Sequence, residues 1–110
     1  MPDIHAFRQL ALAFPNTSEE PHFEKTSFRV GKKIFATLDT TTIVACLKLP
    51  LTEQDVFSLH DAEAIYPVPN AWGKHGWTFV NLNKVRTEVL EDALRIAYAE
   101  VTAKKPKKQK

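Results

Sequence analysis

Three strand-like segments follow one another in the middle of the chain, and they constrain the fold more than any other feature. Residues 26–30 (TSFRV) and 33–38 (KIFATL) flank Gly31-Lys32, a Gly-X pair typical of a two-residue hairpin turn. Residues 40–49 (TTTIVACLKL) come next and are rich in the β-branched side chains that favour strands. The pattern predicts three consecutive antiparallel strands, with Cys46 buried on the last of them.

Further extended segments lie on either side of this group. Residues 20–25 (EPHFEK) predict a strand at a sheet edge, because Pro21 cannot donate to a central ladder. Residues 64–69 (AIYPVP) predict a short extended piece. Residues 76–82 (GWTFVNL) predict a strand in which Trp77 is buried in the core.

Helical patterns lie at both ends and once between the strands. Residues 3–13 have helical apolar spacing and an Asp3 cap. Residues 51–63 predict a short helix with Thr52 as its cap and Asp55 as a capping-box acid. Its apolar side would be formed by Val56, Leu59 and Phe57. The last helix has the clearest stripe, made of Val89, Leu90, Ala93, Leu94, Ala97, Tyr98 and Val101.

This order of elements predicts an α+β fold, an antiparallel β-sheet with the N- and C-terminal helices packed on one face. The 110 residues suffice for one domain, which we assign to residues 1–103. Residues 104–110 (KKPKKQK) form a lysine-rich tail that we expect to be disordered. The sequence shows no signal peptide or spanning segment, so a cytoplasmic protein is expected.

The charges are distributed unevenly. The net charge of +2 depends on the five lysines of the tail, without which the chain has 10 basic and 13 acidic residues. Nucleic-acid binding by the body of the protein would therefore rest on local clusters of positive charge. Between Lys25 and Lys48 there are five bases and one acid, and between Asn70 and Arg86 there are three bases, a histidine and no acid.

The sequence gives little support for an enzyme or a metal-binding protein. The single cysteine excludes a cysteine-rich zinc site, the four histidines lack metal-ligand spacing, and three glycines supply no phosphate-cradling loop. His75 has no neighbouring nucleophile or orienting group in the sequence. We therefore expect a protein that is not an enzyme and that uses no cofactor or metal.

Two stretches carry a resemblance. The segment HFEKTSFRVGKKIFA and the later YPVPNAWGKHGW, in this order and spacing, resemble the MmcQ/YjbR family of small bacterial proteins. The resemblance covers nearly the whole chain. It implies a CyaY/frataxin-like fold and a predicted DNA-binding function with a double-wing motif. Iron binding, as in frataxin, would need an acidic first helix, and this one carries only Asp3.

These observations predict weak, sequence-independent DNA binding through phosphate contacts on the sheet and its hairpins. Trp72 could stack on bases or be part of the core, and the sequence leaves both open. The alternative is a non-enzymatic interaction module that binds a protein or a small anionic ligand in the same region, and the charges could also serve only to solvate the surface. The candidate DNA-binding residues are Lys25, Arg29, Lys32, Lys33, Trp72, Lys74, His75, Lys84 and Arg86.

Overall fold

The computed structural model describes residues 2–22 and 24–102, apart from the side chain of His22; the lysine-rich tail lies outside these residues. Ten elements follow one another along the chain. They are α1 (Ile4–Leu12), β1 (Thr17–His22), β2 (Lys25–Val30), β3 (Lys33–Asp39), β4 (Val44–Lys48), α2 (Leu51–His60), β5 (Ile65–Pro67), α3 (Ala71–Lys74), β6 (Trp77–Asn81) and α4 (Thr87–Thr102).

The strands form one antiparallel sheet in the order β1-β2-β3-β4-β6-β5. The predicted succession of antiparallel strands is confirmed, and β1 lies at the edge that Pro21 indicated. Gly31 has a φ of 63° in the turn between β2 and β3, a conformation that glycine adopts readily. Strand β4 is shorter than predicted because residues 40–43 form a turn, in which the Asp39 carboxylate accepts hydrogen bonds from two backbone N–H groups.

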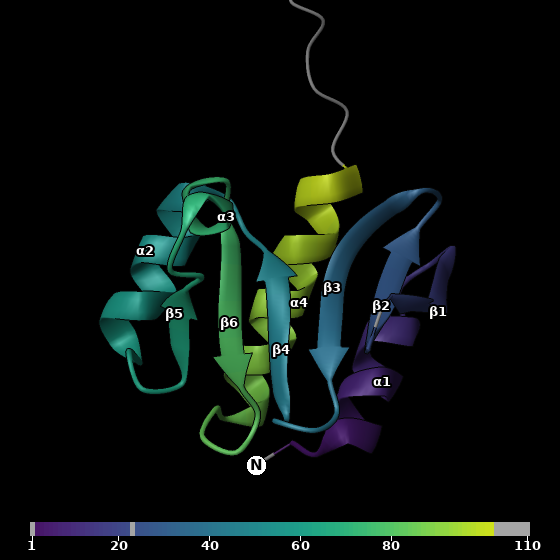
Figure 1. Ribbon diagram of the computed structural model, residues 1–110, viewed down its shortest axis with the longest axis horizontal. Helices are drawn as coiled ribbons and strands as arrows, with labels where there is room; N and C mark the ends of the chain where they lie inside the picture. The colour runs from purple at the N-terminus through teal and green to yellow at the C-terminus, as the bar shows by residue number, and fades with distance from the viewer. Residues whose placement is uncertain (1, 23, 103–110) are drawn as a thin grey trace, which may run out of the picture.

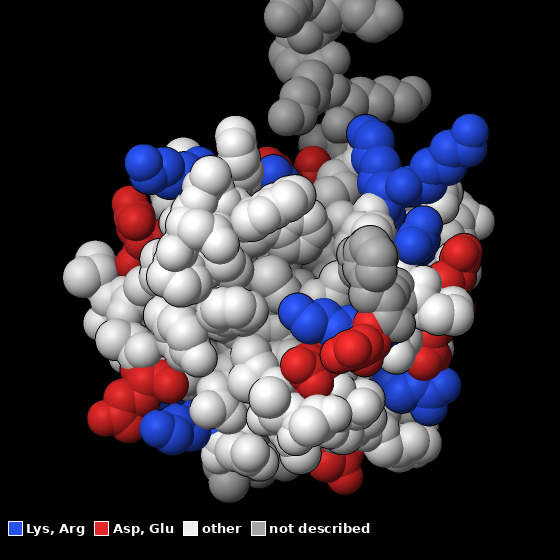
Figure 2. All heavy atoms as spheres, viewed as in Figure 1, with Lys and Arg blue, Asp and Glu red and all other residues white. Residues whose placement is uncertain are grey.

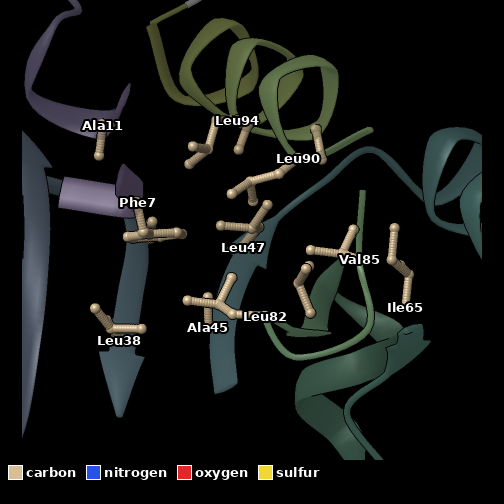
Figure 3. Packing of buried hydrophobic residues seen from close by; sticks show 14 of the residues in the cluster. Phe7, Ala11, Leu38, Ala45, Leu47, Ile65, Leu82, Val85, Leu90 and Leu94 are labelled. Carbon is tan, nitrogen blue, oxygen red and sulfur yellow. The ribbon is translucent and has the colours of Figure 1, made fainter. Parts of the chain in front are cut away.

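Helices α1 and α4 pack on the same face of the sheet, as Figure 1 shows, so the predicted α+β architecture is confirmed. Helix α4 lies across β2, β3 and β4 and also contacts α1. Its predicted stripe faces the sheet, where Leu90, Ala93, Leu94 and Ala97 are fully buried. Figure 3 shows this layer of side chains between the helices and the strands.

Helix α1 is capped at its N-terminus and is held to the sheet by two side chains from its middle. Asp3 accepts a hydrogen bond from the Ala6 N–H at 2.8 Å, which confirms the predicted cap. Phe7 is fully buried against Phe28 of the sheet. Arg8 forms an ion pair with Glu19 of β1 at 2.7 Å, and this pair ties the helix to the edge strand.

A bulge in β3 sends two successive side chains into the core. Phe28 of β2 lies opposite Ala36, whereas Arg29 lies opposite Ile34, so Phe35 has no direct partner. Both Phe35 and Ala36 are fully buried. An extra residue in one strand breaks the alternation of faces and explains this pair.

The second face of the sheet carries no helix within the part of the chain that the structure describes, and Figure 1 is viewed onto it. Residues directly opposite in antiparallel strands point to the same side, so the register assigns this face. We call it the open face. Its side chains, from β2 across to β5, are Lys25, Ser27, Arg29, Ile34, Thr37, Asp39, Val44, Cys46, Lys48, Trp77, Phe79, Asn81 and Tyr66.

Two residues on the open face, Trp77 and Cys46, are less buried than the sequence predicted. Trp77 was expected in the core, but it is half-buried on the open face, because the inward positions of β6 are those of Thr78 and Val80. Cys46 is likewise half-buried on the open face rather than fully buried, since the neighbouring Ala45 and Leu47 occupy the core positions of β4.

Helix α2 is oriented differently from the prediction. Thr52 lies inside the helix, Pro50 occupies the N-cap position, and no side chain caps the helix, so the predicted Thr52 cap and Asp55 capping box are wrong. Val56 and Leu59 are 49% and 85% exposed instead of facing inward, whereas Phe57 packs half-buried against the core. The buried residue of this helix is Gln54, whose amide finds polar partners in the sheet and in α3.

Candidate nucleic-acid interface

The strand register separates the predicted DNA-binding residues into two groups at opposite ends of the sheet. Val30 pairs with Lys33, and Lys48 pairs with Trp77, at the end where α3 also lies. Figure 1 shows the β2–β3 turn and α3 at this upper end. We call this end of the molecule the basic end, and define it by Arg29, Lys32, Lys33, Lys48, Lys74 and His75.

The β2–β3 turn contributes the lysines of one side. Lys32 and Lys33 are exposed, and within residues 2–22 and 24–102 neither forms an ion pair with a carboxylate. Arg29 lies half-buried next to them and its Nε donates to Ser27 Oγ at 2.9 Å. The Ser27 hydroxyl in turn donates to the Glu20 carbonyl at 3.0 Å, so the guanidinium is held against the strand pair.

The segment around α3 contributes the other side. Asn70 caps the short helix by accepting from the Trp72 N–H at 2.9 Å. The helix presents Trp72, which is 61% exposed, and the exposed side chains of Lys74 and His75. Sequence reasoning predicted no helix here, because four residues are too few to show a periodic pattern.

The two glycines of the GKHG stretch let this segment lie close to the neighbouring backbone. Gly73 packs against the Val68 carbonyl, and Gly76 packs against the Leu49 carbonyl with a φ of 104°. A Cβ atom at either glycine would overlap the carbonyl oxygen that it faces. The close contact explains why glycine stands on both sides of Lys74 and His75. These two residues lie on a turn whose backbone packs tightly against Val68 and Leu49.

Gln54 provides the main polar anchor, which sequence reasoning did not identify. The two N–H groups of its Nε2 are shared among three acceptors, the Gly73 carbonyl at 3.0 Å, the Thr78 hydroxyl at 3.0 Å and the Trp77 carbonyl at 3.2 Å. The Thr78 hydroxyl donates onward to the Gly76 carbonyl at 2.9 Å. The buried network fixes α3 relative to α2 and β6.

Lys48 is a second residue that was not among the predicted site residues. Its Nζ donates to the His75 carbonyl at 2.6 Å and lies 5.8 Å from the centre of the Trp77 ring. An ammonium at this distance from an aromatic face is attracted by the ring. Lys48 therefore joins β4 to the α3 segment and adds a positive charge to the basic end.

Three of the predicted residues, Lys25, Lys84 and Arg86, lie at the other end of the sheet. Asn81, Val44 and Asp39 lie side by side at the opposite end of the sheet, and Lys84 and Arg86 follow Asn81 in the loop before α4. The four steps from Trp77 to Asn81 correspond to about 13 Å along the strand. Arg86 also lies 3.9 Å from Glu88 in an exposed ion pair. Lys25 is on the open face near this same end, so the structure does not bring these cations to the basic end.

The thiol of Cys46 has an environment that suppresses its reactivity. Burial raises the pKa of this thiol to about 11, against weaker opposing effects of Lys25 and the Thr78 backbone. A raised pKa keeps the group protonated at neutral pH, and the thiol is a much weaker nucleophile than the thiolate.

We expect Cys46 to react with a thiol reagent at pH 8 roughly 100-fold more slowly than an unfolded cysteine, because the thiolate fraction falls by about that factor. Labelling in native buffer, compared with labelling in denaturant, measures this ratio. A native rate within tenfold of the denatured rate would contradict the assigned environment.

The described residues contain neither a metal site nor a helix that could span a membrane. Within residues 2–22 and 24–102, no group of three or more histidine, cysteine, aspartate or glutamate side chains is placed to hold a metal ion. In the same ranges, no helix has the length and apolar character needed to cross a membrane.

Comparisons with known proteins agree with this architecture. The crystal structure of Deinococcus radiodurans protein DR2400, whose family-model domain is DUF419, superposes with a TM-score of 0.83 and 26% sequence identity, over 94% of this chain and 81% of that chain. No curated protein matches the sequence. The YjbR family model matches residues 12–100, which include the β2–β3 turn, the α3 segment and most of α4. The chain therefore belongs to the YjbR family.

Proposed function

We propose that this protein binds DNA in the bacterial cytoplasm, weakly and without sequence preference, and that it does so without catalysis. The observation that carries the proposal is the gathering of cations from separate parts of the sequence at one end of the sheet. The β2–β3 turn, the end of β4 and the α3 segment all lie at this end, with the turn and α3 on its two sides. Lysine and arginine contacts to phosphates supply most of the affinity in sequence-independent binding.

The two sides of the basic end have the form that such binding needs. Lys32 and Lys33 project from a hairpin turn, while Lys74 and His75 project from a turn that is held by Gly73 and Gly76. Figure 2 shows lysine and arginine atoms grouped over the β2–β3 turn at the upper right of the open face. Exposed side chains on rigid supports can contact phosphates while the backbone stays in place, so little conformational entropy of the backbone is lost on binding.

The test is a titration of a 20-base-pair duplex at several salt concentrations, with a variant in which Lys32, Lys33 and Lys74 are replaced by alanine. The log of the affinity falls linearly with the log of the salt concentration, by about 0.9 per phosphate neutralised. We expect the triple variant to flatten this slope by roughly two to three, at about one unit per contact. The effect should be the same for every duplex sequence.

The structure supplies a matched control. The Lys84→Ala/Arg86→Ala variant removes two positive charges, one fewer than the triple variant, and removes them at the opposite end of the sheet, so its slope should stay close to that of the unchanged protein. Each variant is compared in the full chain and in a chain that ends at residue 103, so that the five tail lysines do not mask the difference. Equal slopes for the two variants, or no salt-dependent binding by the shortened chain, would overturn the proposal.

A second candidate function, a non-enzymatic interaction module, is favoured by an exposed apolar group beside α3. Leu51 is 51% exposed and Trp72 is 61% exposed. A shallow hollow of 350 Å³ next to them is lined by Leu51, Asp55, Val68 and Lys74, among others. Aromatic and aliphatic side chains of this kind are enriched at protein interfaces. A protein partner bound here would show little dependence on the lysines of the β2–β3 turn.

A further inference from the structure

The open face contains a hollow that lies apart from the basic end. It has a volume of 280 Å³, and apolar side chains from three strands line much of it: Val44 and Cys46 of β4, Tyr66 of β5 and Phe79 of β6. Figure 2 shows the middle of this face as mainly uncharged and hollowed, with charged atoms beside it. Pockets for drug-sized ligands measure about 300–1,000 Å³. At 280 Å³ the hollow lies just below this range and suits one small group.

The aromatic side chains here are not part of the core. Tyr66 and Phe79 are opposite each other in the pairing of β5 with β6, and their ring centres lie 5.7 Å apart at an interplanar angle of 59°. Trp77 is on the same face of β6, two residues before Phe79, which corresponds to about 7 Å along the strand. All three rings are half-buried. They form a row on a face that α1 and α4 do not cover.

Polar groups form the rest of the wall. Lys25, Thr37, Asp39 and Thr42 line the hollow. The Asp39 carboxylate accepts from the Thr41 N–H at 2.9 Å and the Thr42 N–H at 3.3 Å, and these backbone bonds, with Lys25 nearby, lower its pKa. Its charge is thus already compensated, while the hydroxyl groups and the carboxylate remain able to bond the edge of a base.

We propose that this hollow holds one unstacked base of a single-stranded DNA whose backbone continues toward the basic end. Phe79 would stack on the base, and the Tyr66 ring, tilted by 59° to Phe79, would contact the edge of the base. Lys25 would contact a phosphate, and Trp77 with Lys48 beside it would take the next nucleotide. This inference rests on the proposed DNA binding and specifies the form of DNA that the open face accepts.

The observations favour a single strand over a duplex at this site. The bases of a duplex are stacked on one another, so their flat faces cannot reach aromatic rings set into a sheet. Proteins that bind single strands combine a positively charged path for the backbone with rings on which bases stack, worth about 1–3 kcal/mol per base. The open face has both parts: the row of rings on β5 and β6, and two cations beside it, Lys48 next to Trp77 and Lys25 in the wall of the hollow.

The experiment uses the full chain with Trp72→Phe, which leaves Trp77 as the single tryptophan. Binding of an oligo-dT 12-mer is followed by quenching of Trp77 fluorescence and compared with binding of a duplex by anisotropy. Phe79→Leu removes one ring and keeps an apolar side chain. We expect this change to weaken binding of the single strand at least about fivefold, the lower limit for one stacked base. Binding of the duplex should stay the same. Phe79→Tyr keeps the ring and should retain the affinity.

Protection of Cys46 provides a second measurement that needs no variant, because the thiol lines the hollow. At pH 9, saturating oligo-dT should slow labelling of Cys46 at least several-fold, whereas duplex at the same saturation should not. Unchanged labelling with saturating single strand overturns the inference, as does an equal affinity of the Phe79→Leu and Phe79→Tyr variants. If duplex binding persists in that case, the proposed function stands alone. If neither form of DNA binds, both proposals fail.

Discussion

Gly76→Ala should lower the free energy of unfolding by more than about 3 kcal/mol, because several costs act together. The residue has a φ of 104°, and a Cβ atom there would overlap the Leu49 carbonyl oxygen. The Gly76 carbonyl also accepts from the Leu49 N–H at 2.8 Å and from the Thr78 hydroxyl at 2.9 Å. Any shift that relieves the overlap disturbs these bonds. Urea unfolding followed by far-UV circular dichroism measures the change.

Gly31→Ala is the matched control. Gly31 also has a positive φ, 63°, but a Cβ atom there would meet nothing within 4 Å. Only the backbone conformation is then unfavourable, which costs roughly 1–2 kcal/mol for an L-residue. The difference between the two variants isolates the clash with Leu49. Equal losses of stability would mean that the α3 segment can move away from β4 at no cost, contrary to the close packing described here.

The strands and terminal helices were predictable because their signals are local. The hairpin at Gly31-Lys32, the Asp3 cap and the stripe of α4 each depend on residues a few positions apart, and each is confirmed. The start of β4 was missed because Thr40–Thr42 are β-branched and still form a turn. There Asp39 bonds two backbone N–H groups and Ile43 takes a φ of 61°. A side chain that bonds its own backbone overrides strand propensity.

The site was only partly predictable, because its geometry depends on strand order. The sequence shows two basic stretches, but it does not show the strand order. Because β6 is inserted between β4 and β5, Lys74 lies at the same end of the sheet as Lys33, and Lys84 lies at the opposite end. The exposure of Trp77 has the same origin. Alternation along β6 establishes two faces, and only the packing of α1 and α4 decides which face becomes the core.

Gln54→Leu is the second change with a large expected effect. The side-chain amide of Gln54 is buried and donates to the Gly73 and Trp77 carbonyls and to the Thr78 hydroxyl. Leucine keeps the bulk and removes all of these bonds. At about 1 kcal/mol for each, the free energy of unfolding should fall by roughly 2–3 kcal/mol. Chemical unfolding measures the loss. Because the network holds α3, DNA binding that depends on Lys74 should weaken as well.

Leu59→Ala is the control that decides how α2 is oriented. The apolar pattern of the helix placed Leu59 toward the core, where its truncation would cost about 2–5 kcal/mol. In the structure Leu59 is 85% exposed, so the expected loss is below about 0.5 kcal/mol, as for an ordinary surface substitution. A large loss for Leu59→Ala together with a small one for Gln54→Leu would show that the helix packs through its apolar side. The reverse result establishes that a buried amide, reaching residues 19 to 24 positions away in the sequence, sets the orientation of α2.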